Sequence, residues 1–537
     1  MPFRGYSRDQ DWLLPPSLGD LIPADHAVRF VAEFIDGLDL AALGIRTEPA
    51  REGAPAFHPR VLLSAWVYGF MSGVRASRQI ERACRESIPF LWLTGMQQPD
   101  HVTLWRFYAA NRASIRPLLK QTVQLALGAG LVEFVLQAVD GSKVAIGSVA
   151  SLCDQAGLDK LLKQVETEIS ALECADGDPQ GTAEEARQRA RRLLGKRGRR
   201  VRLQKAAAVL QERAAAATSC VRRQAQQRVR AAKQRETASA AAQAPTPEAP
   251  PALAEAAAPP LPAVEPFTAV PGEAAAGLQV STTDPTARSL KGRHGFCVGY
   301  NSQVVVDSQA QIVVGADVVD SGNDSNQLAA MLAEAEALCG RRAQAVVADM
   351  GYADIADITA ASVRGTEVYV PDARELRQEG PSQNPYHKAH FVYDVDTDSY
   401  RCPLGKRLLY RGRTCVKGQA GWTYLGQECP GCPAQVSGAC TRAQQRSLTR
   451  FGYEEALAAH AAKMQSETAR QIVRQRKAIV EPVFGLMREQ LGLLRFLVRG
   501  LDKVKAEWRL LCVAHNLRKL WKWWWRPRVQ SALVDSG

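Results

Sequence analysis

The stretch EFVLQAVDGSKVAI, residues 133–146, decides how the rest of the chain is interpreted. Its first residues are mostly apolar or β-branched, which is typical of a buried strand. The pair Asp140-Gly141 closes this strand, and an Asp-Gly pair after a strand often forms a simple turn. We therefore predict a strand that ends in a carboxylate, and this stretch alone does not distinguish a turn from a functional site.

A second short apolar run, AQAVVADMGYAD at 343–354, predicts another buried strand, which ends at Asp349. Further segments complete the pattern: two strands within 295–319 joined at DSQAQ, a helix over 324–340 ended by Gly340, and a strand over 366–373. This order favours an α/β fold with a mixed sheet of the RNase H type, in which the first and fourth strands are parallel neighbours. Asp140 and Asp349 would then meet at the carboxyl ends of adjacent strands.

The stretch RQRKAIVEPVFGLMREQ, residues 474–490, places Glu481 between Arg474, Arg476 and Lys477 on one side and Arg488 on the other. Helical spacing puts Lys477, Glu481 and Arg488 on one face. One interpretation is a surface ladder of salt bridges, and the other is a metal-binding acid flanked by cations that hold a polyanion. Pro482 lacks a backbone donor, so we expect the helix to kink or to begin here.

A helix on one face of this sheet can bring Glu481 to the two aspartates, and three carboxylates together suit divalent-metal chemistry. Mg²⁺ prefers oxygen ligands, and two such ions about 4 Å apart can clamp the attacking and leaving oxygens of a phosphoryl transfer. Asp140, Asp349 and Glu481 are the acids predicted to hold two Mg²⁺ or Mn²⁺ ions. Without metal, the same three acids form a cluster of like charges.

Composition limits the class of protein. The chain has 537 residues, an apolar content of 46% and a net charge of +13. Residues 187–235 hold seventeen Lys and Arg against one acid, Glu212, which suits contact with DNA or RNA phosphates, although a solvated helical face is the alternative. No apolar run is long enough to span a membrane and no signal peptide is visible, so we expect a cytoplasmic protein whose 12 cysteines are thiols or metal ligands.

The N-terminal segment is expected to be helical. Two short helices joined by a turn would form a helix-turn-helix whose second helix presents Thr103, Arg106 and Arg112 to DNA. The alternative is an ordinary helical bundle in which Trp105 and Phe107 belong to the core. The sequence does not decide between the two.

A cysteine-rich stretch lies between the last predicted strand and the Glu481 helix. Its CxxC pair and two further cysteines predict a closed structural zinc site formed by Cys402, Cys429, Cys432 and Cys440. Further candidates are Cys415, His387 and His390. The alternative is a β-rich insertion whose reduced thiols hold no metal.

Composition shifts along the chain predict seven segments. They are a helical domain (1–128), which is DNA-binding in the helix-turn-helix interpretation, the core that carries the three candidate catalytic acids, in three parts (129–154, 281–376 and 451–526), a basic helical or coiled-coil insertion (155–236), a disordered Ala/Pro linker (237–280) and a Cys-rich insertion (377–450). The basic insertion is expected to be interrupted at DGDPQG and GKRG.

Taken together, these motifs resemble the DDE insertion-sequence transposases with an RNase H-like core. The resemblance covers most of the chain apart from the linker. It rests on MPFRGYSRDQDWLLPPSLGDLIPADHAVRFV, FHPRVLLSAWVYGFMSGVRASRQIER, PDHVTLWRF, VDGSKV, TDPTARSLKGRHGFCVGYNSQVVVD, VVADMGYAD, VEPVFGLMREQLGLLRF and HNLRKL. The acids of the family match Asp140, Asp349 and Glu481.

Relatives often carry a Tyr, an Arg and a Lys around the glutamate, and this chain has Arg474, Lys477 and Arg488 at those positions. Positive charge is kept at two of them, so the resemblance implies that they hold phosphates. The missing Tyr puts its stacking or hydrogen-bonding role in doubt.

The resemblance implies a homodimer or larger oligomer, associated with the bacterial nucleoid, that binds terminal inverted repeats and target DNA. It would cleave and transfer DNA strands with divalent metal. Two alternatives stay open, namely an inactive transposase-derived repressor and another RNase H-like nuclease such as a resolvase.

Overall fold

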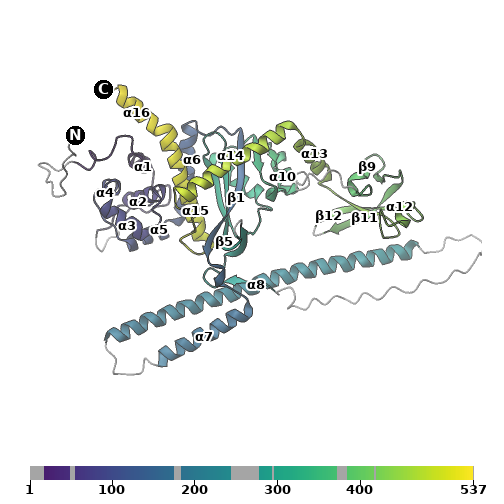
Figure 1. Ribbon diagram of the computed structural model, residues 1–537, viewed down its shortest axis with the longest axis horizontal. Helices are drawn as coiled ribbons and strands as arrows, with labels where there is room; N and C mark the ends of the chain where they lie inside the picture. The colour runs from purple at the N-terminus through teal and green to yellow at the C-terminus, as the bar shows by residue number, and fades with distance from the viewer. Residues whose placement is uncertain are drawn as a thin grey trace, which may run out of the picture. The chain divides into compact units, whose positions relative to one another are not determined.

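The computed structural model describes residues 17–48, 55–174, 183–242, 277–292, 295–371, 384–416 and 419–535. The chain divides into two compact units, each assembled from segments far apart in the sequence. The first unit comprises Met1–Ser151, Thr286–Asp372 and Ala462–Gly537, and the second comprises Leu152–Pro285 and Ala373–Ala461. Helices and a mixed sheet confirm the predicted α/β class (Figure 1).

A six-stranded sheet forms the centre of the first unit. Its strands are β1 (Leu136–Gly147), β4 (Arg288–Gly292), β5 (Gly295–Asp307), β6 (Val313–Val319), β7 (Ala345–Ala348) and β8 (Glu367–Tyr369). β5 pairs antiparallel with β1 on one side and with β4 and β6 on the other, while β7 pairs parallel with β1 and with β8. The first and fourth of the predicted core strands, β1 and β7, are therefore parallel neighbours, as the sequence predicts.

Helices cover this sheet. α9 (Leu328–Cys339) packs on β6 and β5, and α10 (Ile355–Val363) packs on α9 and β8. α9 ends at Gly340, whose φ of 78° fits the predicted glycine stop. α14 (Glu467–Glu489) packs on β1 and β7, and α15 (Leu501–Leu520) packs on β6.

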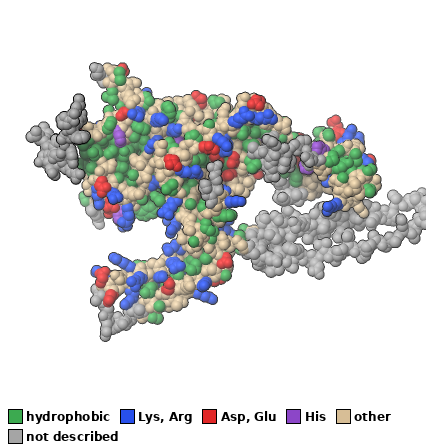
Figure 2. Space-filling model, in the orientation of Figure 1, with side chains coloured by type: hydrophobic (Ala, Val, Ile, Leu, Met, Phe, Trp, Pro, Cys, Tyr) green, Lys and Arg blue, Asp and Glu red, His purple; other side chains and the backbone are tan. Residues whose placement is uncertain are grey.

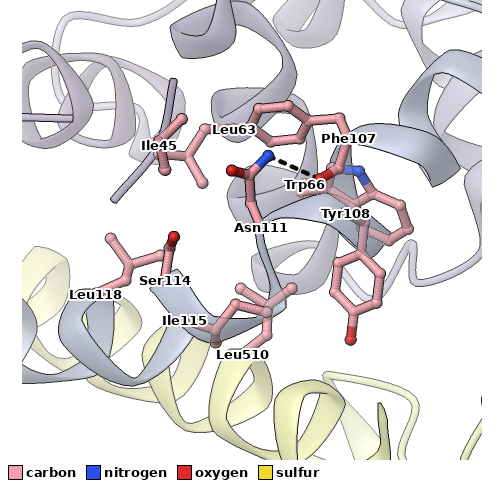
Figure 3. Close-up of a pocket in the computed structure, with 10 residues that line it drawn as sticks. All are labelled: Ile45, Leu63, Trp66, Phe107, Tyr108, Asn111, Ser114, Ile115, Leu118 and Leu510. Carbon is pink, nitrogen blue, oxygen red and sulfur yellow. Dashed lines mark hydrogen bonds between the residues drawn. The ribbon is translucent and has the colours of Figure 1, made fainter. Parts of the chain in front are cut away.

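The N-terminal part of the first unit is helical, as predicted. Its helices are α1 (Ala27–Asp36), α2 (Pro59–Met71), α3 (Ser77–Glu86), α4 (Ile88–Leu93), α5 (His101–Ala110) and α6 (Ile115–Gly128). α2 and α6 pack against α15, which joins these helices to the sheet. Figure 3 shows this apolar packing around Trp66, Ile115 and Leu510, where the cavity of about 20 Å³ holds at most one water-sized molecule.

The C-terminal segment returns to these helices. η6 (Trp521–Trp525) continues α15 and leads into α16 (Arg526–Asp535). Trp525 is buried against Phe30 and donates to Glu33, and Trp521 donates to the carbonyl of Asp25. Packing therefore accounts for these two tryptophans, whereas Trp523 is exposed.

α14 neither begins nor ends at Pro482, so the alternative that a helix begins there is wrong. A proline at this position leaves the carbonyl of Ala478 without its intrahelical N–H partner. The side chain of Gln311 fills this gap, because its Nε2 donates to the Ala478 oxygen at 2.9 Å. A contact from the turn between β5 and β6 thus supports a continuous helix through the proline.

The second unit contains a helical hairpin. α7 (Gln155–Cys174) and α8 (Ala183–Ala242) pack around Leu158, Val165 and Leu203, and the short strands β2 (Leu152–Cys153) and β3 (Val280–Ser281) pair beside them. The predicted interruption at GKRG, 195–198, is wrong because α8 runs through it. Each glycine costs about 1 kcal/mol in a helix, and the surrounding Arg, Lys and Leu favour the helix. The predicted interruption at DGDPQG, residues 176–181, lies outside the described residues.

α8 also extends beyond the predicted end of the basic insertion, since it continues to Ala242. Residues 243–276 of the predicted linker lie outside the described residues, and residues 277–280 lead into β3. The sequence-based division into seven segments stays a prediction.

The other part of the second unit is a five-stranded antiparallel sheet of order β13-β12-β11-β10-β9. Its strands are β9 (Val392–Asp394), β10 (Ser399–Arg401), β11 (Arg407–Val416), β12 (Gln419–Gly426) and β13 (Ser447–Phe451). The short helix α12 (Pro433–Val436) precedes β13, and α13 (Glu454–Met464) follows it. Throughout the described parts of the chain, no helix has both the length and the apolar character needed to cross a membrane.

Candidate active site

Asp140 and Asp349 lie at equivalent positions on adjacent parallel strands. The last paired residues of β1 and β7 are Val139 and Ala348, and each aspartate follows directly. The expected meeting of the two acids is therefore confirmed. The expected end of the strand at Asp140 is wrong, because β1 continues to Gly147 by pairing with β5 alone.

The surroundings of Asp140 disfavour its charge. Burial is the main cause that raises its pKa to about 6, and the nearby carboxylates of Asp349 and Asp324 raise it further. The guanidinium of Arg476 opposes both effects, with Nη1 at 2.8 Å from Asp140 Oδ2. Asp140 Oδ1 accepts a bond of 2.8 Å from the backbone N–H of Gly141.

Asp349 is held by its own turn. Its side chain caps the short 3₁₀-helix η4 (Met350–Tyr352) by accepting from the N–H of Gly351 at 2.8 Å. Burial raises its pKa, and Arg476 and the Gly351 bond act in the opposite direction. The two aspartates and Arg476 therefore form one electrostatic cluster.

A third acid, Asp324, joins this cluster from the loop after β6. Its Oδ1 accepts from the side-chain amides of Asn301 and Gln303, both at 2.7 Å. The hydroxyl of Tyr352 donates to Oε1 of Gln303. A Cβ at Gly141 would lie 2.6 Å from Asp324 Oδ1, and a Cβ at Gly351 would lie 3.1 Å from Asp324 Oδ2. Asp324 thus lies against the backbone beside both aspartates.

Asp324 was not among the predicted site residues, because its position at the start of an amphipathic helix is typical of a helix cap. The signal that points to it lies elsewhere. Asn301 and Gln303 are two polar residues in the apolar strand β5, and their side chains are 1% and 0% exposed. Buried amides require partners, so they predict a polar neighbour that strand β5 alone does not supply.

Glu481 is not joined to this cluster by any contact among the described residues. It lies exposed on α14, between two residues of that helix that contact β1. Arg476 reaches Asp140, and Arg488 donates to Ser142 Oγ at 2.7 Å. α14 therefore packs on β1, the strand that carries Asp140, while the side chain of Glu481 is exposed to solvent.

The flanking cations predicted to hold phosphates also lie on α14. Arg474 and Lys477 are exposed, and Arg474 lies 4.0 Å from Glu467. An exposed ion pair at this distance contributes little, so Arg474 is accessible to a polyanion. Arg476, the cation that contacts Asp140, was not among the predicted site residues.

The predicted DNA-reading residues lie on or just after α5. Asp100 caps this helix by accepting from the N–H of Thr103 at 2.6 Å, and Arg106 is exposed. Arg112 is half-buried and donates to the carbonyl of Ala109. Trp105 is 39% exposed, so it is not a core residue of an ordinary bundle.

The four cysteines of the predicted zinc site lie close together in the second unit. Burial is the main cause that raises the pKa of Cys440, and Cys429, Cys402 and Cys432 raise it further. The side chain of Cys415 lies outside the described residues. In the described ranges, no group of three or more His, Cys, Asp or Glu side chains has the arrangement of a metal site, so both metal sites stay predictions.

The donor set at the aspartate cluster nevertheless suits a hard cation. Asp140 and Asp349 offer carboxylate oxygens, burial disfavours their negative charge, and a cationic group already contacts one of them. A divalent ion would relieve the same excess of negative charge that Arg476 relieves. The residues present therefore fit Mg²⁺ or Mn²⁺ through two aspartates.

Comparison with known families agrees with both ends of the chain. A model described as a transposase DDE domain matches residues 401–521, and a model described as a transposase domain (DUF772) matches residues 16–110. The first match includes β11 to α15 and therefore Glu481, and the second includes α1 to α5. No curated protein and no solved structure matches the chain.

Proposed function

The two matches identify the chain as an insertion-sequence DDE transposase, and from this premise we propose that it cleaves DNA at the ends of its element and joins them to target DNA. The observation that carries the proposal is the pairing of Asp140 and Asp349 at the last register position of two parallel strands. The family matches give no support to a repressor or a resolvase. The RNase H-like description of the core is part of this proposal.

The proposed reaction has two phosphoryl transfers. Water attacks a phosphorus at the element end, the bond to the 3′-oxygen breaks, and a free 3′-hydroxyl and a 5′-phosphate result. That hydroxyl then attacks a target phosphodiester and displaces its 3′-oxygen. Bound Mg²⁺ or Mn²⁺ would supply charge stabilisation and activate the attacking oxygen.

This chain's own residues would position the reactants. Asp140 and Asp349 would hold the metal, and Glu481 would complete the site if the DNA-bound state turns its side chain inward. Arg488, Lys477 and Arg474 would bind phosphates along α14. The acting species is expected to be a dimer or larger complex, because two ends must be held together.

The test of the proposal uses the full chain and DNA that carries the terminal inverted repeats beside its gene. We expect Mg²⁺ or Mn²⁺ to support nicking or cleavage at the element ends and transfer of the 3′-end into a second DNA. Chelation of the metal should abolish both. Binding of these ends without cleavage under either metal would contradict the enzymatic proposal and favour the repressor.

The helical hairpin supports a second, independent part of the proposal, namely binding of the DNA backbone. Arg187, Arg191, Arg202 and Lys205 are exposed on α8 and form no ion pair with a described residue. Their separations of four, eleven and three residues are close to whole helical turns, so they lie along one side over about 27 Å. Figure 2 shows Lys and Arg side chains along this hairpin.

Charge-removing substitutions on this stripe should weaken duplex binding in a salt-dependent way. Each phosphate contact contributes about 0.9 to the slope of log affinity against log salt. A double variant, Arg191→Gln with Arg202→Gln, should therefore lower the slope by about 1.8, measured by fluorescence anisotropy on a duplex of unrelated sequence. Arg197→Gln is the matched control, because Arg197 pairs with Glu173 at 2.8 Å. An equal change in the control would contradict a one-sided contact.

A further inference from the structure

A cavity of about 410 Å³ lies beside the end of β1, outside the aspartate cluster. Four elements of the first unit form it, namely α5, β1, the loop between α14 and α15, and the first turn of α15. Its lining residues are Trp105, Ile146, Arg495, Phe496, Leu497, Val498, Arg499 and Lys503. No acidic side chain lines it, so its chemistry is an apolar floor with a cationic rim.

The rim is available to a ligand. Arg495, Arg499 and Lys503 are exposed, and no described carboxylate pairs with any of them. Trp105 is 39% exposed at the same cavity. Cations beside an accessible aromatic face are the combination that binds single-stranded nucleic acid.

The loop that carries the rim is held in place from beneath. Arg75 donates to the carbonyls of Gly492 and Arg495 and pairs with the buried carboxylate of Glu507. That carboxylate accepts from the N–H groups of Leu497 and Val498 at 3.0 to 3.2 Å. This buried ion pair bonds to the backbone of the exposed loop, and breaking it would leave a buried charge unpaired. The surface that the loop forms is therefore fixed before a ligand binds.

The cavity also lies on the strand that carries the first aspartate. Phe496 donates from its N–H to the carbonyl of Ala145, and Ile146 lies six residues after Asp140 on β1. Six residues of a strand span about 20 Å, which is about six nucleotides of a DNA strand at 3.4 Å each. Arg488 of α14 donates to Ser142, which lies on β1 between Asp140 and Ile146.

We propose that this cavity binds an unpaired nucleotide of DNA, with the base against Trp105 and the neighbouring phosphates on Arg495, Arg499 and Lys503. The inference rests on the proposed function in taking DNA as the substrate. It goes beyond that function by assigning a single-strand subsite about six nucleotides from the reacting phosphate. A paired duplex cannot place one base in the cavity without unstacking it, so the subsite should prefer single strands.

The test measures the affinity of the full chain for a fluorescent single-stranded 12-mer of thymidine and for a blunt duplex, by anisotropy at about 200 mM salt, where purely electrostatic binding is reduced. Base stacking on an aromatic side chain contributes about 1–3 kcal/mol. Trp105→Ala should therefore weaken single-strand binding at least about 5-fold and leave duplex binding unchanged. Trp105→Tyr should restore most of the affinity.

Two controls separate this result from a loss of structure. Trp523→Ala removes another exposed tryptophan, 55% exposed and outside the cavity, and should change neither affinity. Arg499→Gln with Lys503→Gln removes two rim charges and should lower the single-strand salt slope by about 1.4. Unchanged single-strand binding in both the Trp105 and the rim variants would overturn the subsite. Cleavage of element ends by the wild-type protein is measured in a separate experiment. The single-strand subsite and the transposase activity can therefore each fail without the other.

Discussion

An Asp140→Asn variant should retain binding of DNA ends and lose at least about 1,000-fold of the cleavage rate. The substitution keeps an oxygen that can accept from Gly141 but removes the charge that would hold the metal. A loss of about 4 kcal/mol of transition-state stabilisation, within the range of a metal contribution, corresponds to this factor. Single-turnover cleavage of labelled element ends under Mg²⁺ measures the rate, and anisotropy on the same DNA measures binding.

Asp317→Asn is the matched control for this experiment. Asp317 is a carboxylate on β6 of the same sheet, and its partners are Lys505 and Arg509. The control should cleave at nearly the wild-type rate, which would separate the loss of a site charge from the loss of an ion pair in the sheet. Cleavage by Asp140→Asn within about 10-fold of the wild type would contradict the assignment of this acid.

Glu481→Gln and Asp324→Asn then decide which residue is the third acid. We expect the cleavage rate of Glu481→Gln to fall as far as that of Asp140→Asn, because the transposase DDE match includes Glu481. Its exposed side chain would have to turn toward the aspartates when DNA binds. Full activity of Glu481→Gln together with an inactive Asp324→Asn would assign the third position to Asp324 instead.

The sequence predicted the aspartate pair because local pattern and topology agree there. Two apolar runs each end at an aspartate, and the order of strands and helices makes their strands parallel neighbours. Asp324 was missed because its partners, Asn301 and Gln303, lie on a strand whose pairing the local pattern does not reveal. Contacts between distant segments are what a single sequence encodes least directly.

The same limit explains the helix around Glu481. Local rules predict that Pro482 disturbs the helix, since it removes one donor. The compensating donor, Gln311, is 167 residues from its acceptor Ala478, and a residue-by-residue propensity cannot include it. At GKRG the error has another cause, because two glycines lower helix stability by only about 2 kcal/mol, which a long helix tolerates.

Replacement of Arg75 should produce the largest loss of stability. The Arg75–Glu507 pair is buried, with side chains 4% and 2% exposed. Arg75→Met leaves Glu507 buried without its counter-charge, which typically lowers the free energy of unfolding by about 3–5 kcal/mol. Arg82→Met, which breaks the exposed pair of Arg82 and Glu86, should lower it by less than about 1 kcal/mol. Urea unfolding followed by circular dichroism compares the two variants.

The loss in Arg75→Met should also depend on pH in a defined direction. Burial already raises the pKa of Glu507 in the native protein, and Arg75 opposes this effect, so the variant should raise that pKa further. A carboxyl with a raised pKa binds a proton in the folded state while the unfolded state, near pKa 4.3, has released it. The free energy of unfolding of the variant should therefore fall as pH rises above about 4.3, until the raised pKa is passed.

A pH-independent loss, or one no larger than that of Arg82→Met, would contradict a buried unpaired charge. In the double variant Arg75→Met with Glu507→Gln, both the pH dependence and much of the loss should disappear, because no buried charge is left unpaired.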